Sequence, residues 1–295
     1  MHQFKLINNF DNTIQYESVV GMAVYAGDRL QWVEQAMDSI LKQSYHNYLL
    51  VVVIDGQINI DILTFLLESA RRNVNIVLFE GKQNFGLSTC MNHIIDWSLP
   101  RKPKYFFRMD ADDISEPERL ATQVKYLELH PQVSVLGSAL VEIDEKGLKV
   151  GQRKLPLFHN EIVNFLPKRC SINHPTVVIR FEVFEAGYRY RENLRNTQDY
   201  FLWADLSSAG FKFANLAQSL LKFRRVNDFY KRRGLDKSVN EFKARFYTMK
   251  KLGKYSIGNI FYAFAVLGLR LMPPTVVKLA YKIDRYYLSK WVKSE

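Results

Sequence analysis

Short runs of apolar residues alternate with segments of helical spacing along the first half of the chain. The apolar runs cover residues 18–25, 48–54, 75–79 and 104–109, and each has the length of a buried strand. Between them, apolar side chains recur at the spacing of the buried face of a helix. This alternation predicts right-handed crossovers and an α/β fold, in which helices cover both faces of a mostly parallel sheet.

Ligands of such sheets bind beyond the carboxyl ends of the strands, so functional residues are expected in the turns that follow the predicted strands. These turns read Tyr25-Ala26-Gly27-Asp28, Asp55-Gly56, Asn84-Phe85-Gly86 and Asp110-Ala111-Asp112-Asp113. After the last turn, Ser115 and Glu118 have the spacing of a capping box, which predicts the start of a helix that ends near residue 130. Apolar segments on both sides of residues 144–147 predict a β-hairpin.

Composition narrows the class of protein. The chain of 295 residues is 47% hydrophobic and 14% aromatic, which is enough to bury an ordinary core and excludes a disordered protein. Its two cysteines, Cys90 and Cys170, lack the spacing of a disulfide framework or a zinc site. The first residues lack the basic start and apolar run of a secretory signal, so we expect a cytoplasmic protein.

The net charge of +11 is concentrated at one end of the chain. Residues 1–221 carry 23 Lys or Arg and 25 Asp or Glu, whereas residues 222–295 carry 18 and 5. We therefore expect a near-neutral catalytic body followed by a basic helical tail. The tail contains an uncharged stretch, residues 255–269, that is too short to span a bilayer and is soon followed by Pro273-Pro274.

Two interpretations of the tail are open. Cationic clusters such as Lys231-Arg232-Arg233 and Lys250-Lys251 favour contact with a membrane surface, which would place the protein on the inner face of the plasma membrane. Alternatively, the tail packs its apolar face on the body and exposes its lysines to water. The aromatic residues expected at headgroup depth in the first interpretation are Tyr281, Tyr286, Tyr287 and Trp291.

Asp110, Asp112 and Asp113 place three carboxylates within four residues at the end of a predicted buried strand. Such crowding is costly without a cation, and side chains at i and i+2 of an extended segment point the same way. We therefore predict that Asp110 and Asp112 bind one divalent ion, Mn²⁺ or Mg²⁺, through oxygen ligands. Taken alone, the same residues also fit an acidic turn before a helix, where capping and the helix dipole favour carboxylates.

Residues 18 to about 225 resemble glycosyltransferase family 2, the inverting enzymes with the GT-A fold, and in particular those of bacterial cell-surface polysaccharide synthesis. The resemblance rests on ordered blocks, which are SVVGMAVYAGDRLQWVEQAMDSILKQSY, VVVIDG, NFGLSTCMNHII, FFRMDADDISEPERLATQV, INHPTVVIR and TQDYFLWADLSSAGFKFAN. It implies a GT-A domain at 1–225, with a nucleotide-binding half at about 18–115 and an acceptor half at about 116–225. Residues 226–295 would then be the basic, partly apolar helical tail.

Carried over by position, the resemblance implies roles for individual residues. Asp199 would be the general base, His174 is a candidate contact on the acceptor side, and Asp110 and Asp112 would hold the metal and the diphosphate. The donor would be a nucleotide-sugar, by default a UDP-sugar, and the acceptor a hydroxyl of a glycan or a lipid-linked glycan. The residues assigned to the donor site are Ala23, Val24, Tyr25, Asp55, Asn84, Arg108, Asp110 and Asp112.

This assignment makes chemical sense. A metal stabilises the departing diphosphate as a Lewis acid, and a carboxylate at Asp199 removes the proton of the attacking hydroxyl, which gives inversion in one displacement. From residue type alone, Asp199 fits equally well as a first-turn carboxylate of a helix, and His174 as a hydrogen-bonded turn residue before Pro175. Many relatives have Glu where this chain has Gln198, so the base lacks its usual acidic neighbour.

Two other functions stay open. A sugar nucleotidyltransferase would share the α/β layout and the metal, but it should carry a glycine-rich phosphate loop after the first strand, where this chain has only Gly27. A non-enzymatic protein that binds glycans or nucleic acid would explain the basic tail but not the carboxylates at the buried strand. We therefore expect no nucleic-acid partner.

Overall fold

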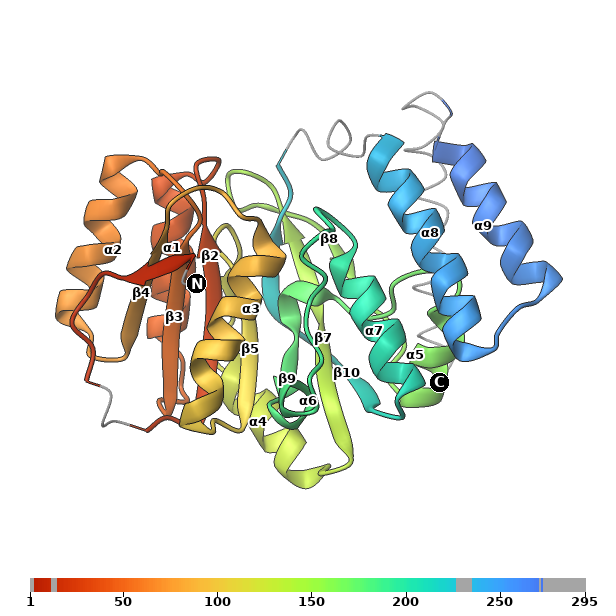
Figure 1. Cartoon of the computed structure of the whole chain (residues 1–295), viewed down its shortest axis with the longest axis horizontal. Coiled ribbons are helices and arrows are strands. Elements are labelled where there is room, and N and C mark those ends of the chain that lie inside the picture. Colours follow the sequence, from red (N-terminus) through yellow and green to blue (C-terminus); the bar gives the residue numbers. More distant parts are fainter. Residues whose placement is uncertain (1–2, 12–14, 227–234, 271, 273–295) are drawn as a thin grey trace.

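The computed structural model describes residues 3–11, 15–226, 235–270 and 272 (Figure 1). Its strands are β1 (Phe4–Leu6), β2 (Ser18–Val24), β3 (Tyr48–Ile54), β4 (Ile76–Gly81), β5 (Tyr105–Asp110), β6 (Ile114–Ser115), β7 (Val133–Ile143), β8 (Lys149–Arg153), β9 (Val178–Arg180) and β10 (Lys212–Arg224). Its helices are α1 (Leu30–Leu41), α2 (Ile60–Arg72), α3 (Leu87–Ser98), α4 (Arg119–Leu129), α5 (His159–Phe165), α6 (Glu182–Glu185), α7 (Gln198–Ser208), α8 (Leu235–Leu252) and α9 (Ile257–Arg270). Two short 3-10 turns are η1 (Leu99–Arg101) and η2 (His174–Thr176).

Within the described residues, one sheet of ten strands runs through the molecule in the order β1-β4-β3-β2-β5-β9-β7-β10-β6, with β8 paired to β7. The four strands predicted from the apolar runs are β2, β3, β4 and β5, and they are parallel neighbours. Farther along, β9 is antiparallel to β5 and β7, whereas β10 is parallel to β7. The predicted α/β fold is confirmed, and its purely parallel part consists of β2, β3, β4 and β5, with β1 antiparallel to β4 at the edge.

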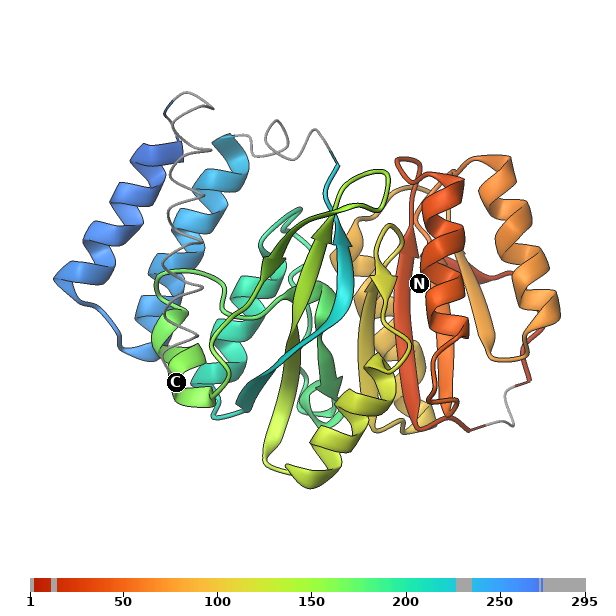
Figure 2. The ribbon, with the colours of Figure 1, turned by 180° about the vertical axis from the view of Figure 1, so that it is seen from behind.

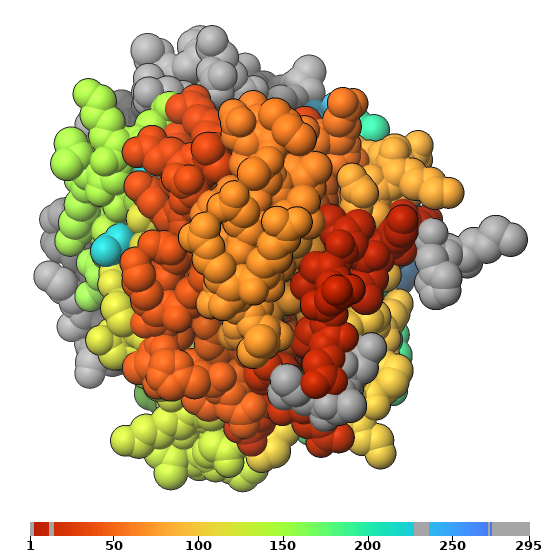
Figure 3. Space-filling model, turned by 90° about the vertical axis from the view of Figure 1, so that its left-hand side faces the viewer, coloured from red at the N-terminus to blue at the C-terminus, as the bar shows by residue number. Residues whose placement is uncertain are grey.

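Helices cover both faces of the sheet. Neighbouring side chains of a strand point to opposite faces, so each strand contributes to two cores. Val19 packs in one core with residues of α3, α5 and α7, whereas Val20 packs in the other core with residues of α1, α2 and α4. α3 and α7 lie in front of the sheet in Figure 1, and α1 and α4 lie in front of it in Figure 2, which is the view from behind. At one end of the molecule, α2 crosses the surface beside the N-terminal segment that contains β1 (Figure 3).

The predicted capping box is wrong, whereas the hairpin around residues 144–147 is confirmed as the antiparallel pair β7 and β8. α4 begins at Arg119, and Glu118 precedes it without a side-chain cap. Ser115 instead belongs to β6, which pairs with β10. The side chain of Gln43 replaces the cap, since its Oε1 accepts a hydrogen bond of 3.0 Å from the Leu120 N–H. Pairing with a distant strand therefore overrides the local capping pattern.

The two described tail helices lie beside the catalytic body (Figure 1). α8 packs on α7, where Lys251 forms an ion pair of 3.4 Å with Asp205. Arg245 on α8 also donates a hydrogen bond of 2.7 Å to the carbonyl oxygen of Lys168. α9 packs on α8 in turn, and Phe264 lies edge-on to Phe242. α8 therefore packs on the body, as the second interpretation of the tail expected.

The division of the chain at residue 225 stays a prediction, and Lys231, Arg232, Arg233, Tyr281, Tyr286, Tyr287 and Trp291 lie outside the described residues. In the described part of the chain, no helix has both the length and the apolar character needed to cross a bilayer.

Gly21 gives a test of the packing at the centre of the sheet. A Cβ at this position would lie 2.8 Å from two ring carbons of the fully buried Phe106, which packs edge-on against Phe184. We expect Gly21→Ala to lower the free energy of unfolding by about 1–3 kcal/mol, the usual cost of overpacking a core. Urea denaturation measures this change.

Gly268 on α9 is the matched control, because a Cβ there would meet nothing within 4 Å. Gly268→Ala should leave stability unchanged or raise it by up to about 1 kcal/mol, since Ala favours a helix over Gly. An equal loss of stability in both variants would contradict this account of the core.

Candidate active site

The carboxyl ends of β2, β3 and β5 meet at one edge of the sheet. In the strand register, Ala23 lies beside Val53 on one side and beside Asp110 on the other. Val24 ends β2 and is buried, whereas the Tyr25 side chain that follows it is 40% exposed. The residues predicted to line the donor site at this edge are therefore neighbours in space.

Asp55, directly after β3, organises the turn that precedes α3. Its carboxylate accepts hydrogen bonds from the backbone N–H groups of Phe85 at 2.7 Å and Gly86 at 2.9 Å. The Asn84 side chain donates a hydrogen bond of 3.3 Å to the Asp55 carbonyl oxygen. Asp55 and Asn84 are thus joined at the sheet edge, while the base contact predicted for the buried Asp55 stays a prediction.

Three carboxylates gather where β5 ends. One oxygen from each of Asp110, Asp112 and Asp113 lies within 4.8 Å of the others. Asp110 is the last residue of β5, and the chain turns directly after it, so the extended backbone that we expected between Asp110 and Asp112 is wrong. Because of this turn, Asp113 joins the two predicted carboxylates, and we refer to the three together as the acidic cluster.

Two arginines partly compensate the negative charge of the acidic cluster. The guanidinium of Arg108, which is 4% exposed, forms an ion pair with the carboxylate of Asp110. Arg224 at the end of β10 donates a hydrogen bond of 2.8 Å from its Nε to the Asp112 carbonyl oxygen. Its backbone N–H donates another of 2.8 Å to Asp113 Oδ1. Arg224 therefore holds the turn in place, a role for which the sequence had offered no motif.

Charge at the acidic cluster is still not fully compensated. Burial, reinforced by the charge of Asp110, raises the pKa of Asp112 to about 6. Burial, reinforced by the charges of Asp112 and Asp110, raises the pKa of Asp113 well above its usual value. Asp113 Oδ2 is buried and has no hydrogen-bond partner within the described ranges. Hard divalent cations prefer clustered carboxylate oxygens. The acidic cluster offers such oxygens with negative charge that the two arginines do not fully compensate, so these residues fit a metal ion.

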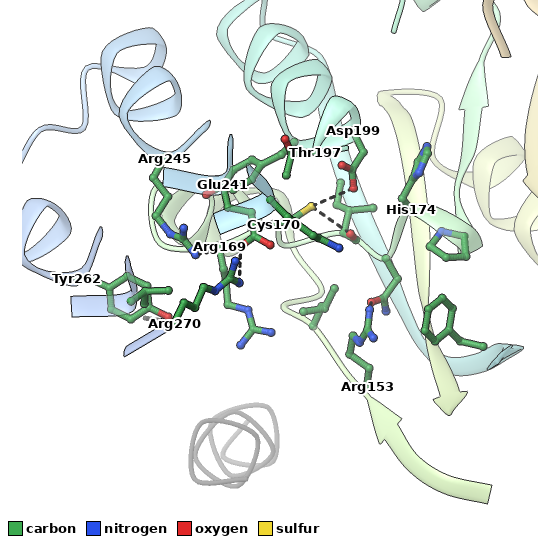
Figure 4. A pocket seen from close by; sticks show the side chains of 18 of the residues that line it. Arg153, Arg169, Cys170, His174, Thr197, Asp199, Glu241, Arg245, Tyr262 and Arg270 are labelled. Atoms are coloured by element: carbon green, nitrogen blue, oxygen red, sulfur yellow. Dashed lines mark hydrogen bonds and ion pairs between the residues drawn. The ribbon is translucent and has the colours of Figure 1, made fainter. Parts of the chain in front are cut away.

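Asp199 and His174 line one cavity of about 480 Å³ (Figure 4). Asp199 is the second residue of α7, and burial raises the pKa of its carboxyl group. Its Oδ2 accepts a contact of 3.8 Å from the Cys170 thiol, whose pKa burial and the Asp199 charge hold well above the usual range. A carboxylate that has a raised pKa and faces a cavity is suited to accept a proton from a ligand there.

His174 lies within 3.0 Å of the Tyr190 hydroxyl through its Nε2. Burial and the positive charge of Arg108 lower the pKa of His174 well below its usual value, so the ring is neutral at physiological pH. The structure thus brings His174 to the cavity that contains Asp199, and its contact with an acceptor stays a prediction.

Arg108 lies at the junction between the acidic cluster and the cavity. It pairs directly with Asp110, and its charge also lowers the pKa values of His174 and Asp199. The donor-side and acceptor-side predictions therefore meet at one buried guanidinium.

The tail also contributes to this cavity, which the sequence did not predict. The lining residues from α8 and α9 are Lys237, Glu241, Arg245, Tyr262, Val266, Leu269 and Arg270. They belong to no recognisable motif, and the only signal in the sequence was the basic composition of this region.

Comparison with known proteins decides the family. The family model described as "Glycosyl transferase family 2" matches residues 20–187. This match covers more than half of the chain. The chain belongs to glycosyltransferase family 2.

Relatives of this family 2 enzyme include bacterial proteins of similar length. The amylovoran biosynthesis glycosyltransferase AmsE of Erwinia amylovora is 29% identical over 279 residues, which cover 90% of this chain and 97% of AmsE. The UDP-Gal:alpha-D-GlcNAc-diphosphoundecaprenol beta-1,3-galactosyltransferase of Escherichia coli is 27% identical, with 77% of this chain and 81% of that protein covered.

Solved structures confirm the GT-A fold. S. aureus TarS 1-349 in complex with UDP superposes with a TM-score of 0.60 and 15% identity, and covers 86% of this chain and 70% of that chain. The mannosyltransferase PcManGT from Pyrobaculum calidifontis, in complex with GDP-Man and Mn²⁺, has a TM-score of 0.54 and 14% identity, and covers 96% and 84%. At such low identity, the likeness to both structures shows the fold alone.

Arg224→Lys tests the role of Arg224 in positioning the acidic cluster. Lysine keeps the positive charge, but it cannot reproduce the bonds that the guanidinium makes to the Asp112 carbonyl oxygen and to Gln35 Oε1 at 2.6 Å. If the acidic cluster binds Mn²⁺, we expect its affinity for the ion to fall about 10- to 100-fold, as it does when groups that orient metal ligands are lost. Isothermal titration calorimetry measures it. An unchanged affinity would contradict the positioning role.

Proposed function

We propose that this family 2 glycosyltransferase moves a sugar, with inversion, from a UDP-sugar to a hydroxyl of a glycan or lipid-linked glycan in cell-surface polysaccharide synthesis. The observation that carries the proposal is the acidic cluster at the sheet edge, joined through Arg108 to the cavity that contains Asp199. The names of the two relatives support the polysaccharide context, and the E. coli name includes both a UDP-sugar and a diphosphate-linked acceptor.

Asp110 and Asp112 would hold the divalent ion, Mn²⁺ or Mg²⁺. The buried carboxylate of Asp113 would add negative charge beside it. When bound, the ion neutralises the charge that develops on the diphosphate as the sugar leaves. The Mn²⁺ and the nucleotide-sugar bound to PcManGT support this assignment. Ala23, Val24, Tyr25, Asp55 and Asn84 would surround the nucleotide at the neighbouring strand ends.

Asp199 would act as the general base. A carboxylate that faces the acceptor hydroxyl removes its proton as the oxygen attacks the anomeric carbon on the side opposite to the diphosphate. The raised pKa of Asp199 makes it a stronger base than an exposed carboxylate, and the neutral His174 beside it can exchange hydrogen bonds with acceptor hydroxyls. Membership of family 2 favours this reaction over that of a sugar nucleotidyltransferase.

α9 would bring the enzyme to the inner face of the plasma membrane. Ile257, Phe261 and Phe264 lie on one side of α9 and are 89%, 73% and 57% exposed. Lys250 and Lys251 precede this helix and are exposed. An apolar stripe with cations beside it suits the boundary between acyl chains and anionic headgroups.

Two variants separate the proposed roles of the carboxylates. Asp112→Asn should weaken Mn²⁺-dependent UDP binding by roughly 100-fold, because it removes a charged ligand of the ion. Asp199→Asn should keep this binding and lower turnover by about 100- to 10,000-fold, since it removes only the base. Calorimetry with UDP and Mn²⁺ measures binding, and the slow hydrolysis of a panel of nucleotide-sugars measures turnover.

Asp61→Asn is the control for both measurements, because this exposed carboxylate in the first turn of α2 belongs neither to the acidic cluster nor to the lining of the cavity. It should change neither quantity. If Asp112→Asn bound UDP and Mn²⁺ as tightly as the unaltered enzyme, the metal assignment would be wrong.

The pH dependence of turnover gives a further prediction for Asp199. A base works only when it is deprotonated, so kcat should fall on acidification through the pKa of Asp199, which burial raises above the ordinary value of 3.8. We expect a fall with the slope of a single proton, measured at saturating donor and metal. An acidic midpoint at or below the ordinary Asp value would contradict the role of Asp199.

A further inference from the structure

The cavity around Asp199 has an excess of positive charge. Among the described residues that line it, the acidic side chains are Asp199 and Glu241, and the cationic ones are Arg153, Arg169, Lys237, Arg245 and Arg270. Glu241 already forms ion pairs with Arg245 at 3.5 Å and Arg270 at 2.5 Å. A partly enclosed space lined mainly by one sign of charge concentrates ligands of the opposite sign. The cavity therefore favours an anionic ligand.

Arg270 provides an unused donor in this wall. Its Nη2 pairs with Glu241, whereas its Nη1 is buried and has no hydrogen-bond acceptor in the part of the chain that the structure describes. Guanidinium groups present several N–H donors in a fixed plane, a geometry that matches the oxygen atoms of a phosphate group. A ligand oxygen would satisfy this donor.

The same cavity also has an apolar wall. Tyr262, Val266 and Leu269 of α9 line it, and Ile257 and Phe261 on the same helix are exposed to solvent. α9 therefore presents apolar surface both inside the cavity and outside it. A ligand that carries a phosphate group and a hydrocarbon group could therefore contact the arginines with the first and α9 with the second.

Arg245 and Arg270 lie at the opposite end of the cavity from Asp199. Figure 4 shows Arg245, Arg270 and Tyr262 at one end and Asp199 with His174 at the other, while Cys170 lies between them. A single elongated ligand can therefore reach Asp199 with a sugar hydroxyl and the arginines with an anionic group.

We propose that Arg169, Arg245 and Arg270 form a binding subsite for a phosphate group on the acceptor, which places the acceptor hydroxyl at Asp199. The acceptor is then a glycosyl phosphate or diphosphate whose apolar group lies along α9. This proposal rests on the proposed function only for the role of Asp199, because the phosphate subsite can be tested without turnover. The alternative role for the three arginines is to neutralise Glu241 and Asp199 within the fold.

Binding of geranyl diphosphate to the full chain tests the subsite. The titration is done by calorimetry in EDTA, so that no divalent ion can hold a diphosphate at the acidic cluster. Without an ion, the carboxylates of the acidic cluster repel the probe. We expect saturable binding that weakens as salt is added, because salt screens the charges.

Arg169→Gln should weaken this binding about tenfold or more, the usual effect of losing one charge-assisted hydrogen bond. Arg270→Lys keeps the charge opposite Glu241 but removes the fork, so we expect a smaller loss in the same direction. Arg71→Gln is the matched control, since it removes an exposed cation from α2, at the other end of the molecule from α9 (Figure 1). Thermal unfolding checks that all three variants are folded.

Two further probes identify the group that is recognised. Inorganic pyrophosphate should also bind, more weakly than geranyl diphosphate because it lacks the apolar group, and it should lose affinity in Arg169→Gln. Geraniol, which lacks the phosphate groups, should bind far more weakly. The proposal is wrong if geranyl diphosphate does not bind, if Arg71→Gln weakens it as much as Arg169→Gln does, or if geraniol binds equally well.

Failure of this proposal is distinguishable from failure of the proposed function. Arg169→Gln should keep Mn²⁺-dependent UDP binding, and Asp112→Asn should keep geranyl diphosphate binding in EDTA. Loss of UDP binding alone would count against the donor site, whereas loss of geranyl diphosphate binding alone would count against the phosphate subsite.

Discussion

The buried ion pair between Arg108 and Asp110 is the interaction on which the site depends. Three carboxylates at one turn repel one another, and burial penalises the charged forms of Asp112 and Asp113. Arg108 offsets part of this cost at Asp110, and Arg224 holds the turn through its bonds to the Asp112 carbonyl oxygen and to Asp113. The remaining negative charge fits the proposed metal ion, because the fold already holds the three carboxylates together against their mutual repulsion.

The position of Arg108 also explains why two distant parts of the sequence act at one place. β5 carries Arg108 into the buried sheet, and η2 and α7 bring His174 and Asp199 within range of its charge. Burial lowers the pKa of His174 but raises that of Asp199, whereas the charge of Arg108 acts to lower both pKa values. The proposed donor and acceptor sites are thereby coupled electrostatically.

Patterns within short stretches of sequence predicted the parallel half of the sheet and the grouping of Asp110 with Asp112. The parallel strands were predicted correctly because strand periodicity is a local property. Asp110 and Asp112 do lie together, but the turn after β5 brings them together and not the extended backbone that the pattern implied. The capping box at Ser115 failed because pairing between β6 and β10 took that residue into a strand. Arg224 was missed for a related reason, since its bond to Asp112 joins residues 112 positions apart. No spacing rule reaches across such a distance.

The involvement of α8 and α9 in the cavity has a consequence for how such enzymes diversify. These helices lie outside residues 20–187, the segment that defines the family, yet they form one wall of the space in front of Asp199. Substitutions in them reshape that wall while the strands that present the acidic cluster keep their sequence. Divergence confined to the C-terminal quarter of the chain can therefore change the shape of the cavity while the acidic cluster is retained.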